Sequence, residues 1–378
     1  MKKISFNHPI APKFSNIFKK LNKENRYSSS GKFSYLCETW LKKNIKCKES
    51  LVVGSCTAAL EMCAILLNIK KNDEVIMPSY TFVSTANAFA LRGGKPVFVD
   101  IDKFTCNIDP NKIEKAINKK TKAIIVVHYA GVSCDMDPII KIAKKYNLYV
   151  IEDAAQAILS KYKNKNLGSI GDLATISFHE TKNIHCGKGG ALLINNPKFI
   201  KRAKIIKDKG TNRDLFNRNL LKKYTWVDYG SSYGLSEINC AILYSQLKKA
   251  KQINKQRLLI FKHYHNKLKK LENNNLIIRP TIPKHCENNG HIYYIILKKR
   301  LRNKLISYLK NYNIYTTFHY IPLHQSPFGR KKGKKSCKMN VTNFVSQNLI
   351  RLPMHSKLDK NEINKISNTI YKFFIKYA

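Results

Sequence analysis

The sequence predicts an α/β fold in which a mainly parallel sheet is covered by helices on both faces. Three observations lead to this prediction. From about residue 50, short apolar runs alternate with segments of helical length. The runs are apolar throughout, which is typical of strands buried on both faces of a parallel sheet. Caps, prolines and glycines separate the two kinds of segment, as in repeated βαβ units. The 378 residues are enough for two domains with a buried core.

The predicted elements follow one another in a regular order. Helices are expected to begin at Ser55 and Ser84, and also where Asp109 and Asp137 are each followed by a proline at the first helical position. The helix from Ser84 ends before the glycine pair 93–94. The strands are short and apolar, and they are expected at residues 51–53, 74–77, 96–100, 123–127, 148–151, 173–178 and 191–194.

The pattern changes after about residue 235. A long helical stretch runs to about residue 271 and is followed by a mixed α/β region that includes 315–319. We therefore expect a large domain over residues 1–248 and a smaller C-terminal α/β domain over residues 249–378. Packing of the N-terminal segment on the smaller domain is left open.

The chain carries a formal net charge of +45. Such a charge is one sign of a nucleic-acid partner. However, lysine supplies 58 of the basic residues and arginine only 11, and they are spread over the whole chain. Nucleic-acid surfaces more often concentrate charge and use the arginine fork. The only dense basic cluster, 330–335, is expected to be a solvated loop. We expect no specific nucleic-acid partner, although a nucleic-acid-binding protein stays as an alternative.

The cysteines and the apolar runs indicate in which cellular compartment the protein is expected. The ten cysteines include no C-x-x-C pair, so the spacing of a metal site is absent and reduced thiols are expected. No apolar run approaches the roughly 18 residues that cross a bilayer. No apolar segment follows Lys2 and Lys3 as it would in a signal peptide. We expect a cytoplasmic protein with no membrane insertion and no bound metal.

Two polar motifs follow predicted strands, at the edge where open α/β sheets bind ligands. Residues 54–60, Gly-Ser-Cys-Thr-Ala-Ala-Leu, begin a helix whose N–H groups and dipole suit a phosphate. Ser55 and Thr57 also fit as simple helix caps. Asp153, within Glu-Asp-Ala-Ala-Gln at 152–156, is an acid that could pair with a protonated pyridine nitrogen or cap a helix.

Two further motifs involve lysine and glycine. Lys182 lies in Ser-Phe-His-Glu-Thr-Lys-Asn at 177–183, again after a predicted strand. A lysine in a partly desolvated pocket has a lowered pKa and can form a Schiff base, whereas most lysines are solvated surface charges. Gly-Lys-Gly-Gly at 187–190 fits a tight turn before the next strand. The order of all four motifs along the chain is what favours a functional site.

In this order, the motifs closely resemble the DegT/DnrJ/EryC1/StrS aminotransferases, the sugar aminotransferases of pyridoxal-5′-phosphate (PLP) fold type I. The resemblance covers almost the whole chain. It implies the PLP-dependent transferase fold type I, with PLP as the cofactor. It rests on long matching blocks at 77–87, 127–131, 152–156, 177–183, 223–226 and 318–324.

The resemblance also implies roles for individual residues. Lys182 would be the catalytic residue that forms the Schiff base with PLP. Asp153 would pair with the pyridine nitrogen, Gln156 would lie near the ring hydroxyl, and Phe82 would stack on the ring. The phosphate would be held by Cys56, Thr57 and Ser177, and by Ser232 of the neighbouring subunit. The segment that borders the sugar pocket would contain His319, Tyr320 and His324.

The function implied by the resemblance is transfer of the amino group of L-glutamate to C4 of a dTDP-linked 4-keto-6-deoxy sugar. The enzyme would be a homodimer that serves cell-surface polysaccharide synthesis. Alternatives are other nucleotide keto-sugars, UDP-linked or aminated at C3, and a PLP-binding regulator without turnover. A sugar dehydrase is disfavoured, because those relatives carry His where Lys182 stands.

The sequence departs from the family pattern in two places. Gly31 is preceded by three serines, residues 28–30, where close relatives are richer in Gly and Asp. Lys188 stands where the glycine turn of the family usually carries Glu, which reverses a charge close to Lys182. We expect its side chain to turn away from Lys182 or to pair with a carboxylate such as Glu180.

Overall fold

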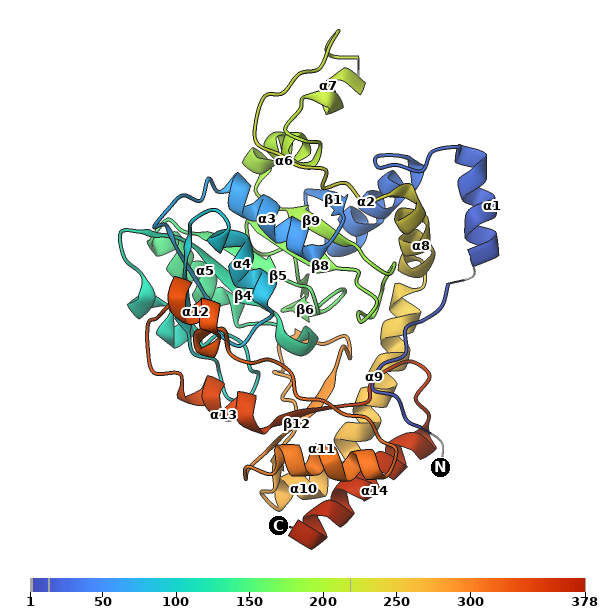
Figure 1. Ribbon diagram of the computed structural model, residues 1–378, viewed down its shortest axis with the longest axis vertical. Coiled ribbons are helices and arrows are strands. Elements are labelled where there is room, and N and C mark those ends of the chain that lie inside the picture. Colours follow the sequence, from blue (N-terminus) through green and yellow to red (C-terminus); the bar gives the residue numbers. More distant parts are fainter. Residues whose placement is uncertain (1–2, 13, 218, 378) are drawn as a thin grey trace.

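The computed structural model describes residues 3–12, 14–217 and 219–377, and Figure 1 shows how their elements are arranged. The strands of its main sheet are Glu49–Val53 (β1), Glu74–Pro78 (β2), Lys95–Val99 (β3), Thr121–Val127 (β4), Tyr149–Asp153 (β5), Leu173–Ser177 (β8), Gly190–Ile194 (β9) and Lys334–Lys335 (β13). Their order is β1-β9-β8-β5-β4-β2-β3-β13. The neighbours from β8 to β13 run parallel, whereas β9 is antiparallel to both β1 and β8. The predicted α/β fold with a mainly parallel sheet is thereby confirmed.

Helices cover both faces of this sheet. They span Lys32–Ile45 (α2), Cys56–Leu66 (α3), Val83–Ala90 (α4), Met136–Lys145 (α5), Ile200–Lys207 (α6) and Glu237–Leu247 (α8). Successive residues of a strand point to opposite faces. Ile124 of β4 therefore lies in a buried cluster with residues of α2, α5 and α8, whereas Ile125 lies in a cluster with residues of α3, α4 and α6. Because both faces are covered, the long strands are mainly apolar.

Three helix predictions need correction. Helix α5 begins at Met136, so Asp137 and Pro138 lie in its first turn rather than at its cap. The Asp-Pro pattern cannot distinguish these cases, because proline is tolerated throughout the first turn. Asp109 does cap, but only the 3-10 turn Pro110–Lys112 follows it. The long helical stretch after residue 235 is divided into α8, α9 (Ala250–Lys267) and α10 (Lys269–Asn273).

The C-terminal region has a buried core of its own. It contains a three-stranded sheet of β10 (Ile277–Ile278), β12 (Tyr293–Leu297) and β14 (Leu349–Leu352), and helices α11 (Arg302–Asn311) and α14 (Lys360–Tyr377). Ile4, near the N-terminus, belongs to the same core and forms a backbone bridge with Ile314. Within residues 315–319, Thr317 forms a single backbone bridge with Arg351 of β14.

The remaining elements are short, apart from two helices. Figure 1 shows that α7 projects from the body of the molecule next to α6. None of the helices within the described ranges is long and apolar enough to cross a membrane. These remaining helices and strands are α1 (Phe14–Glu24), α7 (Arg213–Asn217), α12 (Pro327–Lys332), α13 (Asn340–Asn348), β6 (Lys161–Tyr162), β7 (Lys165–Asn166) and β11 (Cys286–Glu287).

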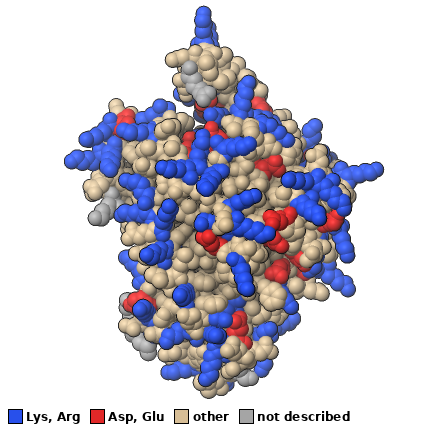
Figure 2. Space-filling model, turned by 180° about the vertical axis from the view of Figure 1, so that it is seen from behind, with Lys and Arg blue, Asp and Glu red and all other residues tan. Residues whose placement is uncertain are grey.

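The basic cluster 330–335 is part of regular structure. Its first residues end α12, and its last two form β13, which extends the main sheet beside β3. Lys334 Nζ lies 2.7 Å from Glu74 Oε1. The prediction of a solvated loop was wrong, because the unpaired backbone groups of an edge strand can accept a partner strand of any side-chain type. Figure 2 shows lysines and arginines spread over the visible face rather than gathered in one patch.

Candidate active site

A cavity of about 860 Å³ lies at the carboxyl ends of three parallel strands. Val127 ends β4, Asp153 ends β5 and Ser177 ends β8, and all three line it. This is the edge at which open α/β sheets bind ligands. Of the residues predicted for the site, the cavity is lined by Cys56, Thr57, Phe82, Asp153, Gln156, Ser177, Lys182, His319 and Tyr320.

Lys182 follows β8 in a turn that its own backbone N–H closes by donating to the His179 carbonyl (2.9 Å). Within the described ranges, its amino group has no hydrogen-bond or ion-pair partner. Burial lowers the pKa of Lys182; Cys56 and Asp153 oppose this change, and Arg351 adds to it. A lysine that loses its proton easily is in the nucleophilic form that a Schiff base requires.

Asp153 is the last residue of β5, and its carboxylate is buried. One oxygen accepts a hydrogen bond from the Thr85 hydroxyl (2.7 Å) and the other from the Ala155 N–H (3.2 Å). Burial raises the pKa of Asp153, while these two donors act in the opposite direction. A cation beside the carboxylate, such as a protonated pyridine nitrogen, would favour its charged form.

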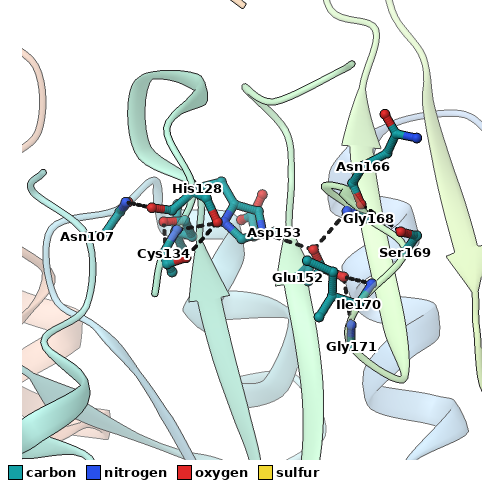
Figure 3. Close-up of polar contacts among 12 residues, drawn as sticks. Asn107, His128, Cys134, Glu152, Asp153, Asn166, Gly168, Ser169, Ile170 and Gly171 are labelled. Atoms are coloured by element: carbon teal, nitrogen blue, oxygen red, sulfur yellow. Dashed lines mark hydrogen bonds and ion pairs between the residues drawn. The ribbon is translucent and has the colours of Figure 1, made fainter. Parts of the chain in front are cut away.

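Glu152, the residue before Asp153, is fully buried and holds the end of β5 in place (Figure 3). Its carboxylate accepts hydrogen bonds from His128 Nε2 (3.0 Å) and from the N–H groups of Gly168, Ile170 and Gly171 (2.7 Å each). Burial opposes ionisation, but these donors outweigh it, so the pKa of Glu152 lies below its usual value. The Cys134 N–H donates to His128 Nδ1 (3.2 Å), so the ring carries its proton on Nε2.

Gln156 connects the sheet to the C-terminal region. Its Oε1 accepts a hydrogen bond from the Ala130 N–H (2.7 Å), and its Nε2 donates to the Tyr320 hydroxyl (2.9 Å). The Tyr129 hydroxyl lies 2.7 Å from His319 Nδ1. The rings of His319 and Tyr320 stack with centroids 3.7 Å apart. Two hydrogen bonds thus position the segment that was predicted to border the sugar.

The N-terminus of α3 forms one end of the cavity. Ser55 is its N-cap and accepts a hydrogen bond from the Ala58 N–H (3.0 Å), and the Thr57 hydroxyl lies 2.7 Å from that of Ser84. A Cβ added at Gly190 would lie 2.4 Å from the Cys56 nitrogen, so only glycine allows β9 to pass this close. First-turn N–H groups and hydroxyls form a donor set that suits a phosphate.

Ser232 and His324 do not line the cavity. Ser232 is exposed, and its backbone forms a bridge with Asp208. The two ring nitrogens of His324 lie 2.7 Å from the Ser79 hydroxyl and 3.1 Å from the Asn343 amide oxygen. His324 therefore anchors the segment 319–324 from behind instead of forming the cavity wall.

Sequence reasoning missed Arg257, His291 and Arg351, which also line the cavity. They belong to the C-terminal region and no local motif marks them. One signal was present for Arg351: it is the only charged residue within the apolar run Leu349–Leu352, and a charge in a buried strand needs a partner. Thr85, which donates to Asp153, carries no comparable signal.

Lys188 lines the same cavity with an exposed side chain. Across the residues that the structure describes, its amino group forms no ion pair with Glu180 or with any other carboxylate. Of the two alternatives expected for Lys188, pairing with a carboxylate is therefore not found among the described residues, and a side chain turned away from Lys182 stays a prediction. The positive charge that acts on the pKa of Lys182 is that of Arg351.

Comparisons with known proteins agree with this geometry. The model of the DegT/DnrJ/EryC1/StrS aminotransferase family matches residues 10–371. An uncharacterised protein of Methanocaldococcus jannaschii is 40% identical over 89% of this chain and 88% of its own. The spore coat polysaccharide biosynthesis protein SpsC of Bacillus subtilis is 33% identical over 85% of each chain. The crystal structure of Helicobacter pylori PseC, an aminotransferase involved in the biosynthesis of pseudoaminic acid, matches with a TM-score of 0.89 and 26% identity over 100% of both chains.

Proposed function

Because the chain belongs to the DegT/DnrJ/EryC1/StrS aminotransferase family, whose cofactor is PLP, we propose that it transfers the amino group of L-glutamate to a nucleotide-linked keto-sugar. The observation that supports this proposal is that Lys182, Asp153 and the N-terminus of α3 line one cavity. The cavity offers a complementary group for each part of PLP. These are the first-turn N–H groups for the phosphate, Lys182 for the aldehyde and Asp153 for the pyridine nitrogen.

When bound, PLP supplies an aldehyde that condenses with amines and a ring that withdraws electrons. The residues of the chain do the rest. Lys182 would hold the cofactor through its Nζ, and the same amine, once free, would take and return the proton at Cα of glutamate. Asp153, held by Thr85, would pair with the pyridine nitrogen and favour its protonated form. Phe82, which has an exposed side chain at the N-cap of α4, would cover the ring.

For the acceptor we propose dTDP-4-dehydro-6-deoxy-D-glucose, which would become dTDP-4-amino-4,6-dideoxy-D-galactose in the cytoplasm. The motifs resemble those of dTDP-4-amino-4,6-dideoxygalactose transaminase, an enzyme of enterobacterial common antigen synthesis. The relative SpsC takes part in the biosynthesis of a polysaccharide. Both similarities support a role in making a cell-surface polysaccharide.

A panel of acceptors tests this proposal. Purified protein with PLP and L-glutamate should form an amino sugar and 2-oxoglutarate from the dTDP-4-keto sugar, as read by mass spectrometry. UDP-linked and 3-keto sugars should react at least about tenfold more slowly. A substrate that lacks one polar contact with its binding site loses at least this factor in kcat/KM. A protein that binds PLP without turning over any acceptor would be a regulator instead. A colourless protein that retains nucleic acid would contradict the proposal altogether.

We further propose that the active unit is a homodimer in which Ser232 reaches the site of the partner. Trp226 and Tyr229, near Ser232 in the chain, leave 76% and 62% of their surface exposed, as expected before a second copy covers them. The guanidinium carbon of Arg92 lies 4.9 Å from the centre of the Tyr229 ring. Arg92 follows the C-terminal end of α4, and the N-terminal end of this helix begins beside the cavity. The exposed aromatic surface thus contacts the end of α4 that lies away from the cavity.

Mixing two inactive variants tests the shared site. Lys182→Ala and Ser232→Asp chains should each be inactive alone, because each homodimer lacks one component in both of its sites. A random mixture is half heterodimer, and each heterodimer has one intact site, so about a quarter of the wild-type activity should return. Equal mixing without recovery, or a fully active monomer by size-exclusion chromatography, would contradict the shared site.

A further inference from the structure

His291 lines the cavity from the C-terminal region, shortly before β12, and it is buried. Its Nδ1 lies 3.0 Å from the amide oxygen of Asn183, the residue that follows Lys182 in the chain. Burial, and then the positive charge of Lys182, hold the pKa of His291 well below its usual value. The ring is therefore neutral at physiological pH, with a proton on one nitrogen and a lone pair on the other.

Two side-chain amides fix which nitrogen of His291 carries the proton. The amide nitrogen of Asn254 donates to the Ile158 carbonyl (3.1 Å), so its oxygen accepts from the amide nitrogen of Asn183 (3.0 Å). The Asn183 amide nitrogen also donates to the Asn289 carbonyl (2.9 Å), which leaves only its oxygen to face His291. An amide oxygen can only accept a hydrogen bond. Nδ1 of His291 therefore donates, and Nε2 keeps the lone pair.

Nε2 of His291 is an acceptor without a donor. No residue of the described ranges forms a hydrogen bond with it, and it is open to the cavity that the imidazole lines. The Lys182 amine is a donor in the same cavity, and it too has no partner among the described residues. Of the charges that act on the pKa of His291, that of Lys182 acts most strongly. The two unpaired groups are complementary and line one cavity.

We propose that Nε2 of His291 accepts a hydrogen bond from the Lys182 amine whenever that amine is not attached to the cofactor, and thereby directs the lone pair of the amine. This inference rests on the proposed aminotransferase function and adds a positioning residue to it. A free lysine amine has two N–H groups and one lone pair on a flexible stem. Once His291 holds one N–H, the lone pair has fewer directions in which to point, which favours the direction toward Cα of the substrate.

The neutral state of His291 suits this role. Lys182 would take a proton from Cα of glutamate and give it back, so the proton must stay on Nζ in between. A basic imidazole beside the amine would compete for that proton. His291 does not, because the cavity lining already holds four basic side chains of lysine and arginine against a single acid, and another buried positive charge would be unfavourable. His291 therefore accepts a hydrogen bond without removing the proton.

The first test measures the Lys182 amine in the whole chain freed of PLP. Limiting acetic anhydride is applied over a range of pH, and peptide mass spectrometry gives the midpoint at which Lys182 becomes reactive. In His291→Phe the ammonium form loses its acceptor, so the midpoint should move about one pH unit lower. His291→Gln, which keeps an acceptor near the place of Nε2, should restore most of the change. A purely structural histidine predicts the opposite sign, because a loosened site admits water and moves the midpoint up.

The second test follows the PLP-loaded protein with L-glutamate alone, in a single turnover. His291→Phe should slow this reaction by about tenfold or more, while the glutamate concentration that gives half the maximal rate changes little. Glutamate deuterated at Cα should react more slowly still, because proton transfer then limits the rate. The matched control is His355→Gln, which replaces another buried imidazole of the C-terminal region, bonded to the Ser5 carbonyl (3.2 Å). Its rate should stay within about threefold of the wild type.

An unchanged or higher labelling midpoint in His291→Phe would overturn the proposal, and so would an unchanged single-turnover rate with L-glutamate. Slowing confined to the reaction with the keto-sugar would assign Nε2 to a sugar hydroxyl and would overturn it too. If His291→Phe does not fold, His291→Met takes its place, since a thioether is only a weak acceptor. If the midpoint and the glutamate reaction change as expected but no keto-sugar is aminated, the inference stands and the proposed acceptor fails.

Discussion

Replacing Lys182 with alanine is expected to lower turnover by about four orders of magnitude or more and to abolish covalent attachment of PLP. The variant loses both the amine that holds the cofactor and the base that moves the proton, and each function alone is worth a factor of hundreds to thousands. Lys182 is suited to both, because burial lowers its pKa and no described residue engages its amino group. Borohydride reduction of the loaded protein followed by peptide mapping should place the label on Lys182.

The cavity offers its own control for this experiment. Lys188→Ala removes the other lysine of the lining and should leave both the label and turnover within a few-fold of the wild type. If the label appeared on Lys188 or on any lysine outside the cavity, the assignment of Lys182 would be wrong. Free methylamine added to Lys182→Ala should restore a part of the proton transfer, since a small amine can occupy the vacated position.

Asp153→Asn is expected to reduce turnover by about a thousandfold while the fold is retained. A carboxylate 4 Å from a pyridinium contributes about 4 kcal/mol at an effective dielectric constant of 20, which corresponds to roughly three factors of ten. Asparagine keeps the size of the side chain and one acceptor for the Thr85 hydroxyl, but it removes the charge. Steady-state kcat with L-glutamate and the keto-sugar measures the effect.

Thr85→Ala is the matched control for this substitution. It removes one hydrogen bond to Asp153 and leaves the charge in place, so turnover should fall by about tenfold or less. Asp153→Asn with kcat within tenfold of the wild type would mean that the carboxylate does not act on the ring nitrogen. Equal losses in Asp153→Asn and Thr85→Ala would assign the effect to side-chain position instead of charge.

The sequence could predict the place of a residue where that place depends only on its immediate neighbours in the chain. The apolar strands were recognisable because each one is buried on both faces, so its composition alone distinguishes it from the helices. Lys182 and Asp153 could be predicted because each directly follows a strand, and the ends of parallel strands meet at one edge. The main errors in the elements arose where local patterns are ambiguous, as at Asp137, where proline fits anywhere in the first turn.

Only the tertiary structure decided which distant residues share the cavity. Arg351 lines the same cavity as Lys182 although the two lie far apart in the sequence. That its guanidinium has no hydrogen-bond partner among the described residues is a property of packing that no sequence window contains. The same holds for Thr85, whose hydroxyl supports Asp153, and for His324, which supports the cavity wall from behind. The sequence by itself determined the fold and the residues at the strand ends. The apolar composition of each strand and the order of the elements can both be read from short stretches of the chain. The wall opposite the sheet was decided by how the C-terminal region folds back on it, because contacts between distant segments depend on packing in three dimensions.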